Sequence, residues 1–349
     1  MEQGISIIIC SHNGELRIPT TLSHLRAQTT PSVPWEVVLI DNASEDDTTK
    51  VAVSSWADGP VPLRVVNEAK LGLQHARERG LREAKYDFLG FVDDDNWVAQ
   101  DWVLVAHDTL ASDPALGAEG SVCDPVFEVP KPKWFDGFHS SYAILTDSDL
   151  VRYREPEYLS GAGLCLRKYA WTQLIHQGFH SSMTDRFGAQ LSGGGDTELT
   201  SAIRLAGWKI RVEPRLRLKH FMPAERLTWS YLRRLQRGYT ASQVLLDAYS
   251  PHSVSMTLGF KQWLGHVWWC QLASSVLKLV RRPNALFVTL TSSGEHRQDV
   301  IEIERLYGRI LGMLRVKRRY GTLRRHVRHA PWRLRRSEES TSPRDRTSV

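Results

Sequence analysis

Residues 86–98 read YDFLGFVDDDNWV and are the most informative stretch of the chain. The apolar run FLGFV is typical of a buried strand, and it stops abruptly at three adjacent carboxylates, Asp93, Asp94 and Asp95. Adjacent carboxylates repel one another, and a bound cation is the simplest compensation for their charge. Oxygen ligands with room for phosphate oxygens favour Mg²⁺ or Mn²⁺. The same triplet would also suit an acidic turn in water, because Asp is common in turns.

Strand-like and helix-like runs alternate through the first hundred residues. The patterns predict strands at residues 5–10, 37–40, 63–66 and 87–92, and helices at residues 16–28, 46–56 and 71–84. This alternation predicts an α/β fold, in which helices flank both faces of a mostly parallel sheet. Ligands of such sheets bind beyond the carboxyl ends of the strands.

Polar residues follow three of the four predicted strands. Because the carboxyl ends of parallel strands lie at one edge of a sheet, these residues together predict a single ligand site there. They are Ser11, His12 and Asn13 after the first strand, Asp41 and Asn42 after the second, and the Asp triplet after the fourth. Taken alone, Asp41 and Asn42 would fit an ordinary turn.

The glycine pattern argues against two nucleotide-binding folds. The first strand is followed by CSHNGEL, which lacks GxGxxG, and no GxxxxGK[ST] loop occurs in the chain. Dinucleotide-binding and P-loop folds are therefore not expected. A metal-dependent nucleotidyltransferase stays open as an alternative, although it would usually need a glycine-rich basic loop at this point.

The composition is that of a globular protein. The chain has 349 residues, of which 42% are hydrophobic and 24% charged, enough for one large domain with a smaller appendage. Its four cysteines show no CxxC spacing, which favours a reducing compartment. The N-terminal residues carry no pattern of a secretion signal, so we expect a cytoplasmic protein.

Basic charge is concentrated near the C-terminus. Residues 315–336 hold ten Lys or Arg residues and no acid, whereas the rest of the chain holds 39 acidic residues against 35 basic ones. Such blocks bind anionic lipid or nucleic acid, or have no partner. Residues 263–280 predict an amphipathic helix that either lies in a membrane interface or packs on the main domain. We expect a membrane surface rather than nucleic acid, and a non-enzymatic binding module is the second alternative.

The motifs together resemble the inverting, GT-A-fold glycosyltransferases of family 2. The segments SIIICSHN, EVVLIDNASEDDT, LGLQHARERG and FLGFVDDDNWV come in the family's order, followed by YLSGAGLCLR and GGGDTELTSAIRLAGWKI. The segment from His220 to Arg233 is similar to bacterial polysaccharide-assembly members. The resemblance implies transfer of one sugar from a nucleotide diphosphate, most often UDP, to a glycan or lipid-linked acceptor. The expected place is the inner face of the plasma membrane.

The resemblance also implies roles for single residues. Asp41 would bind the base, and His12 would pack against it. Asp93 would contact the ribose or the metal, while Asp95 and His220 would ligate the Mn²⁺ or Mg²⁺ that bridges the diphosphate. Asp196 matches the catalytic base, although Gly195 stands where many members have Glu. The rest of the expected nucleotide-sugar site is Ser11, Asn13, Asn42, Lys70, Arg77 and Asp94, and the expected sugar or acceptor pocket is Trp97, Gly161, Gly163, Gly195 and Glu198.

Each of these residues also has a structural interpretation. Asp196 could be only the N-cap of a helix at residues 199–206, with Thr197 as the other candidate, and Glu198 is a rival base. Arg77 could be a solvated helix residue, Trp97 part of the core, and His220 an ordinary strand-end histidine.

The chemistry agrees with the implied roles. Loss of a nucleotide diphosphate needs a cation or cationic side chain, and the acceptor hydroxyl needs a carboxylate to take its proton. One base without a nucleophile gives a single displacement and hence inversion. We predict a catalytic domain at residues 1–238, a helical basic extension at 239–336 and a disordered tail at 337–349.

Overall fold

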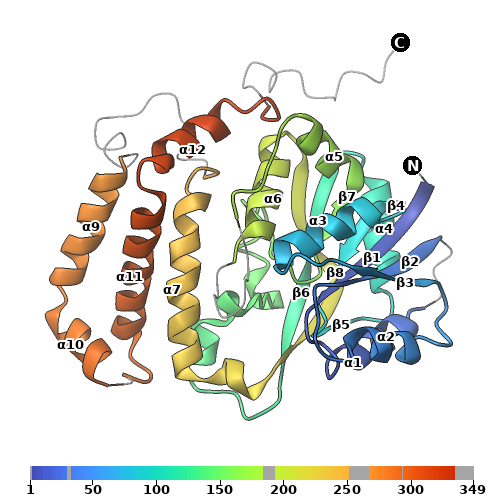
Figure 1. The fold of residues 1–349 in the computed structure, drawn as a ribbon, viewed down its shortest axis with the longest axis horizontal. Helices are drawn as coiled ribbons and strands as arrows, with labels where there is room; N and C mark the ends of the chain where they lie inside the picture. Colours follow the sequence, from blue (N-terminus) through green and yellow to red (C-terminus); the bar gives the residue numbers. More distant parts are fainter. Residues whose placement is uncertain (1, 30–32, 184–192, 251–266, 293, 335–349) are drawn as a thin grey trace.

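The computed structural model describes residues 2–29, 33–183, 193–250, 267–292 and 294–334. Figure 1 shows two parts, a sheet covered by helices and a layer of long helices beside it. The described residues form a mixed eight-stranded sheet in the order β3-β2-β1-β4-β7-β6-β8-β5. The strands are β1 (Glu2–Ser11), β2 (Trp35–Asp41), β3 (Leu63–Asn67), β4 (Tyr86–Phe91), β5 (Asn96–Val98), β6 (Leu116–Phe127), β7 (Cys165–Arg167) and β8 (Lys209–Met222).

The register of the first strands places their carboxyl ends next to one another at the same edge of the sheet. Strands β1 to β4 are parallel neighbours, and Ser11 pairs with Asp41, which pairs in turn with Asn67 of β3. The residues that follow these strands therefore emerge side by side. The predicted α/β class is confirmed.

Helices cover both faces of the sheet because β1 alternates its side chains between them. Ile5, Ile7 and Ile9 pack in one core and Ile8 in the other, as the two-residue period of a strand requires. The first core includes residues of α1 (Ile18–Arg26), α2 (Thr48–Ser55) and α4 (Trp102–Ser112). The second includes residues of α3 (Leu73–Glu83), α5 (Lys168–His176) and α6 (Gly195–Leu205).

The helical layer begins with α7 and lies at the left of Figure 1. Its members are α7 (Trp229–Leu246), α9 (Trp268–Val280), α10 (Pro283–Thr291), α11 (Gln298–Val316) and α12 (Arg319–Arg328). Glycines bring α11 close to α7, since a Cβ on Gly308 or Gly312 would lie 2.2 or 2.5 Å from a backbone oxygen of α7. The predicted domain boundary at residue 238 falls inside α7, which runs on without a break.

Three further segments complete the sheet and its cover. Residues 209–222 form one strand, β8, whose pairing with β6 shifts register where residues 214–216 bulge out. Residues 116–127 form its neighbour β6. The segment after β6 is anchored in the core by Trp134 and Phe135.

The basic block at residues 315–334 is a packed element. Helix α12 and the residues after it bury Tyr320, Val327 and Trp332, because the apolar side of this basic helix faces the protein. Trp332 lies 5.7 Å from the ring of Phe179 and stacks at 6.3 Å on Tyr249. The predicted disordered tail, and residues 263–266 of the predicted amphipathic helix, lie outside the described residues. Within the described ranges, no helix has both the length and the apolar content that crossing a bilayer requires.

Candidate active site

The ends of β1 and β2 form the first wall of the site. Asn42 is buried, and its side chain donates to the backbone oxygens of Glu68 and Lys70 and accepts from the backbone N–H of Gly72. It therefore fixes the loop after β3, on which the Lys70 side chain is exposed. Asp41 is buried and accepts from the backbone N–H of Ser44. The exposed His12 ring is held by a 2.9 Å contact between Nδ1 and the backbone oxygen of Asn42, and Asn13 beside it is also exposed.

The middle carboxylate of the triplet is a structural anchor. Ser11 Oγ donates to Asp94 at 2.6 Å, and Arg17 donates to both Asp94 oxygens at 3.1 and 2.9 Å. These bonds tie the end of β1 to the end of β4 and neutralise one of the three charges. Ser11 and Asp94 thus hold each other in place, while their predicted role in nucleotide binding stays a prediction, and Arg17 is a residue that the sequence analysis missed.

The third carboxylate meets both a histidine and a second arginine. Asn96 of β5 pairs with His220 of β8, which places His220 Nε2 3.4 Å from Asp95 Oδ1. Arg226, in the turn after β8, donates to Asp95 Oδ2 at 2.8 Å. Asp95 and His220 are both buried, and within the described residues His220 Nδ1 has no hydrogen-bond partner. Arg226 was also missed by the sequence analysis.

Asp93 is the carboxyl group of the turn whose pKa is raised. Burial raises the pKa of its carboxyl group, and the neighbouring carboxylate of Asp95 raises it further, whereas the Arg77 guanidinium and His220 oppose the rise. An added cation would favour the charged form of this group. Arg17 pairs with Asp94, Arg226 pairs with Asp95, and Arg77 is the guanidinium that opposes the pKa rise of Asp93.

Two of these side chains, Asp95 and His220, are placed as neighbouring ligands of one divalent cation would be. A separation of 3.4 Å between His220 Nε2 and Asp95 Oδ1 is long for a hydrogen bond and close to the roughly 3 Å between adjacent ligands of an octahedral ion. Mixed oxygen and imidazole ligands suit Mn²⁺. Among the residues that the structure describes, no three His, Cys, Asp or Glu side chains are grouped closely enough to enclose an ion.

Asp196 stands opposite Arg77 across Gly161. A Cβ on Gly161 would lie 2.5 Å from the Arg77 guanidinium and 2.9 Å from Asp196 Oδ2, so both side chains reach the same small space. The interpretation of Asp196 or Thr197 as an N-cap is wrong, because Gly194 caps α6 with a φ of 128° that favours glycine. Asp196 Oδ1 accepts from the Thr197 N–H, which orients Oδ2 toward Gly161.

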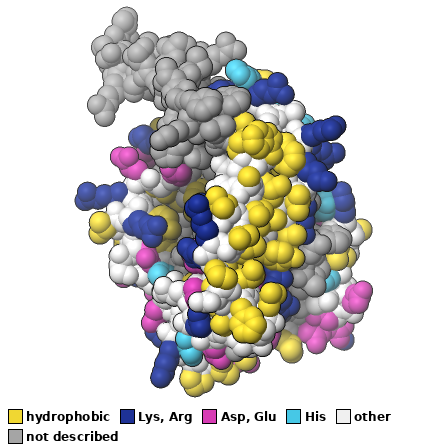
Figure 2. Space-filling model, turned by 90° about the vertical axis from the view of Figure 1, so that its left-hand side faces the viewer, with side chains coloured by type: hydrophobic (Ala, Val, Ile, Leu, Met, Phe, Trp, Pro, Cys, Tyr) yellow, Lys and Arg dark blue, Asp and Glu magenta, His cyan; other side chains and the backbone are white. Residues whose placement is uncertain are grey.

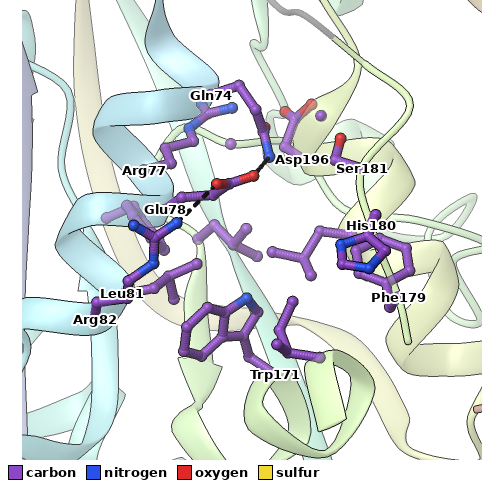
Figure 3. Close-up of a pocket in the computed structure, with 16 residues that line it drawn as sticks. Gln74, Arg77, Glu78, Leu81, Arg82, Trp171, Phe179, His180, Ser181 and Asp196 are labelled. Carbon is purple, nitrogen blue, oxygen red and sulfur yellow. Dashed lines mark hydrogen bonds and ion pairs between the residues drawn. The ribbon is translucent and has the colours of Figure 1, made fainter. Parts of the chain in front are cut away.

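A pocket of about 550 Å³ opens beside this pair. Figure 3 shows Arg77 and Asp196 near one end of it and Trp171 at the other. Gly161 and Gly195 also line this pocket, and their predicted place on the sugar or acceptor side stays a prediction. Helix α3 closes one wall and helices α5 and α6 close the other. Seven of the lining side chains are apolar, Leu81, Phe91, Leu164, Trp171, Ile175, Phe179 and Leu199, and seven are polar or charged, Gln74, Arg77, Glu78, Arg82, His180, Ser181 and Asp196.

Three residues predicted for the sugar or acceptor pocket are engaged in contacts inside the protein. Glu198 is fully buried and accepts hydrogen bonds from Ser181, Ser182 and Tyr249, so it cannot reach an acceptor and is corrected to a structural role. Trp97 stacks on His24 and Phe221, which engages its ring inside the protein. Gly163 has a φ of 65°, and a Cβ there would collide with Leu218 and Ser121, so packing explains it.

Comparison with known proteins identifies the class of enzyme. Residues 6–159 match the family model described as glycosyl transferase family 2. The matched segment is similar to family 2, and together with the relatives it shows that the protein is a glycosyltransferase. As an enzyme it is not the non-enzymatic binding module that the sequence left open.

Two sequence relatives agree with this assignment. The chain is 25% identical to the succinoglycan biosynthesis protein ExoM of Rhizobium meliloti over 253 residues, which cover 70% of this chain and 75% of ExoM. It is 35% identical to the uncharacterized glycosyltransferase YfnE of Bacillus subtilis over 106 residues, but this match covers 30% of the chain and 26% of YfnE.

The mannosyltransferase PcManGT of Pyrobaculum calidifontis, solved with GDP-Man and Mn²⁺, has a TM-score of 0.55 to this glycosyltransferase at 18% identity. The alignment covers 89% of this chain and 86% of PcManGT, and it confirms the predicted GT-A fold.

Proposed function

We propose that this glycosyltransferase moves one sugar, with inversion, from a nucleotide-diphosphate sugar to a glycan or lipid-linked acceptor during cell-surface polysaccharide synthesis. The observation that carries the proposal is the meeting of Arg77 and Asp196 at Gly161, beside the acidic turn. A cationic group for the leaving diphosphate and a carboxylate for the incoming hydroxyl are the two groups that such a transfer needs. The printed role of ExoM in succinoglycan biosynthesis supports the polysaccharide setting.

The donor would bind at the adjacent carboxyl ends of β1, β2 and β4. Asp41 and His12 would hold the base, with UDP as the expected nucleotide, and Asp93 would contact the ribose. Lys70 is exposed on the loop that Asn42 fixes, where it can reach a phosphate. Arg77 would meet the diphosphate from α3, because its guanidinium already counteracts the charge of Asp93.

A divalent cation, Mn²⁺ or Mg²⁺, would be held by Asp95 and His220, with Asp93 beside them. When bound, it supplies positive charge to the leaving diphosphate. PcManGT, which shares the fold, was solved with Mn²⁺. In this chain Arg226 also contacts Asp95, so the protein itself contributes a cationic group at the same carboxylate.

Asp196 would act as the general base. Its Oδ2 points to the Gly161 space, which only a residue without a side chain leaves open to an acceptor hydroxyl. The pocket beyond would receive the acceptor. Attack by that hydroxyl, with no protein nucleophile intervening, inverts the configuration at the transferred carbon in one displacement. We further propose that the enzyme works in the cytoplasm as a peripheral protein at the membrane face.

Two variants test the roles separately. We expect Asp196→Asn to lower turnover by at least ~10²-fold while nucleotide binding stays unchanged, because the amide cannot accept the proton. We expect Asp95→Asn to abolish the metal-dependent part of nucleotide binding. The readouts are release of the nucleotide from the donor in the presence of a membrane extract, and calorimetry with UDP, GDP and TDP, each with and without Mn²⁺.

The matched control is Asp136→Asn, which changes an exposed carboxylate paired with Lys131 at the surface. It should leave both readouts unchanged. Full turnover in Asp196→Asn would remove the base assignment, and absence of binding by every nucleotide would remove the donor site.

A further inference from the structure

The outer surface of α9 and α10 is apolar at helical spacing. On α9, Trp269, Val276 and Val280 are exposed by 56%, 41% and 65%, and they follow one face of the helix. On α10, Phe287 and Leu290 are exposed by 67% and 77%. With Leu277, which is also exposed, these side chains form what we call the docking face. Figure 2 shows the hydrophobic side chains of this side as a continuous band, with Lys and Arg side chains along its edges.

Folding of the helical layer does not account for this surface. Helix α9 already packs its other side, since Trp268 and Leu272 contact the small core formed by Val244, Met313 and Tyr320. Exposed large apolar side chains are ordinary when scattered, but a contiguous set marks an interaction surface. From Trp269 to Val280 the stripe extends for about 16 Å along α9 at the helical rise of 1.5 Å per residue.

The positive charge of the segment that contains α9 and α10 favours an anionic partner. Residues 267–292 hold three cations, Lys278, Arg281 and Arg282, and no acidic residue. All three are exposed near the apolar stripe, at the end of α9. Two copies of this segment placed face to face would bring their cations together, and like charges disfavour that pairing. A basic-rimmed apolar helical face matches the headgroup region of an anionic membrane.

We propose that the docking face inserts α9 and α10 into the headgroup region of an anionic bilayer, with both helices lying in the plane of the membrane. This inference rests on, and deepens, the proposed peripheral location of the glycosyltransferase. It also selects between the two C-terminal candidates: α12 buries its apolar residues Tyr320 and Val327 in the protein, so it has no apolar face left to insert.

Vesicle binding tests the proposal on the full chain. We expect co-sedimentation with vesicles of phosphatidylcholine and phosphatidylglycerol, and at least about tenfold weaker binding for Leu277→Glu and for Phe287→Glu, because each places a charge where an apolar side chain inserts. Val53→Glu is the matched control, since Val53 is 53% exposed on α2, away from the docking face. It should bind vesicles as the wild type does.

Two more measurements separate the possible outcomes. Lys278→Gln combined with Arg281→Gln should weaken binding to vesicles with phosphatidylglycerol far more than binding to phosphatidylcholine alone. Calorimetric nucleotide binding should be equal in all variants, which shows that they fold. Wild-type protein that ignores both vesicle types would overturn the proposal, as would a dimer in light scattering that Phe287→Glu dissociates. Vesicle binding without nucleotide binding would contradict the donor site and leave the docking face standing.

Discussion

Glu304 joins α11 to α7 within the helical layer, and its removal should lower the stability of the protein. Its side chain on α11 is 1% exposed and lies between two arginines of α7. Arg233 donates to one carboxylate oxygen at 2.8 Å, and Arg237 lies 2.6 Å from the other. Arg233 also donates to the backbone oxygen of Thr289, so the same cluster holds α10.

The substitution Glu304→Ala leaves two guanidiniums facing each other without an anion between them. Breaking a buried ion pair costs about 3–5 kcal/mol. Because Arg233 and Arg237 are 19% and 39% exposed, water relieves part of this cost, and we expect a loss of about 3 kcal/mol in the free energy of unfolding. With a urea dependence of about 3 kcal/mol per M, as expected for a protein of this size, the unfolding midpoint should fall by about 1 M.

Urea unfolding followed by circular dichroism measures this loss, and Glu302→Ala provides the control. Glu302 lies on the same helix and pairs with Arg305 at 3.0 Å, but it is 43% exposed, so its removal should cost less than about 1 kcal/mol. Equal small losses in both variants would refute the argument, because they would show that Glu304 behaves as a surface ion pair.

The remaining predictions concern a buried acid and the catalytic glycine. Burial raises the pKa of Glu119 from its ordinary value of 4.5 to about 7. Between pH 4.5 and pH 7 the carboxyl group therefore keeps its proton in the folded state and loses it in the unfolded state. The free energy of unfolding falls as pH rises through this range. Glu119→Gln should therefore gain a few kcal/mol over the wild type between pH 5 and pH 8 in thermal or urea unfolding, and a constant difference across that range would contradict the shift. Gly161→Ala should lower turnover by about 10²-fold with an unchanged melting temperature, because its Cβ displaces the ends of Arg77 and Asp196. Gly193→Ala, whose Cβ would meet nothing within 4 Å, should keep full activity, and equal activity in both variants would argue against the geometry at Gly161.

The strand-end residues of the site could be predicted from the sequence. Each follows an apolar or β-branched run, and parallel pairing brings the ends of such runs to one edge. Asp41, Asn42 and the Asp triplet were found in this way. The positions of Asp196 and His220 depended on the family resemblance, because each comes from an element that reaches the site through tertiary packing.

Arg17 and Arg226 could not be predicted. Both are long side chains that cross from other elements to a carboxylate, 77 and 131 residues away in the chain. The sequence indicates that three adjacent acids need counter-charge, but no periodic pattern says which arginine supplies it. Strand β6 was missed for a different reason, since glycine, charged residues and proline interrupt the apolar side chains of its sequence LGAEGSVCDPVF.

The position of Trp332 affects how this enzyme can be shortened or fused. Trp332 covers Phe179 and Tyr249, and the Tyr249 hydroxyl holds Glu198, which in turn fixes Ser181 and Ser182 beside the Asp196 pocket. A fragment that ends after α11 would retain every residue of the site, yet it would expose aromatic rings and loosen the loop that lines the pocket. The segment around Trp332 thus supports the loop beside the active site, and fusion partners should be attached beyond residue 334.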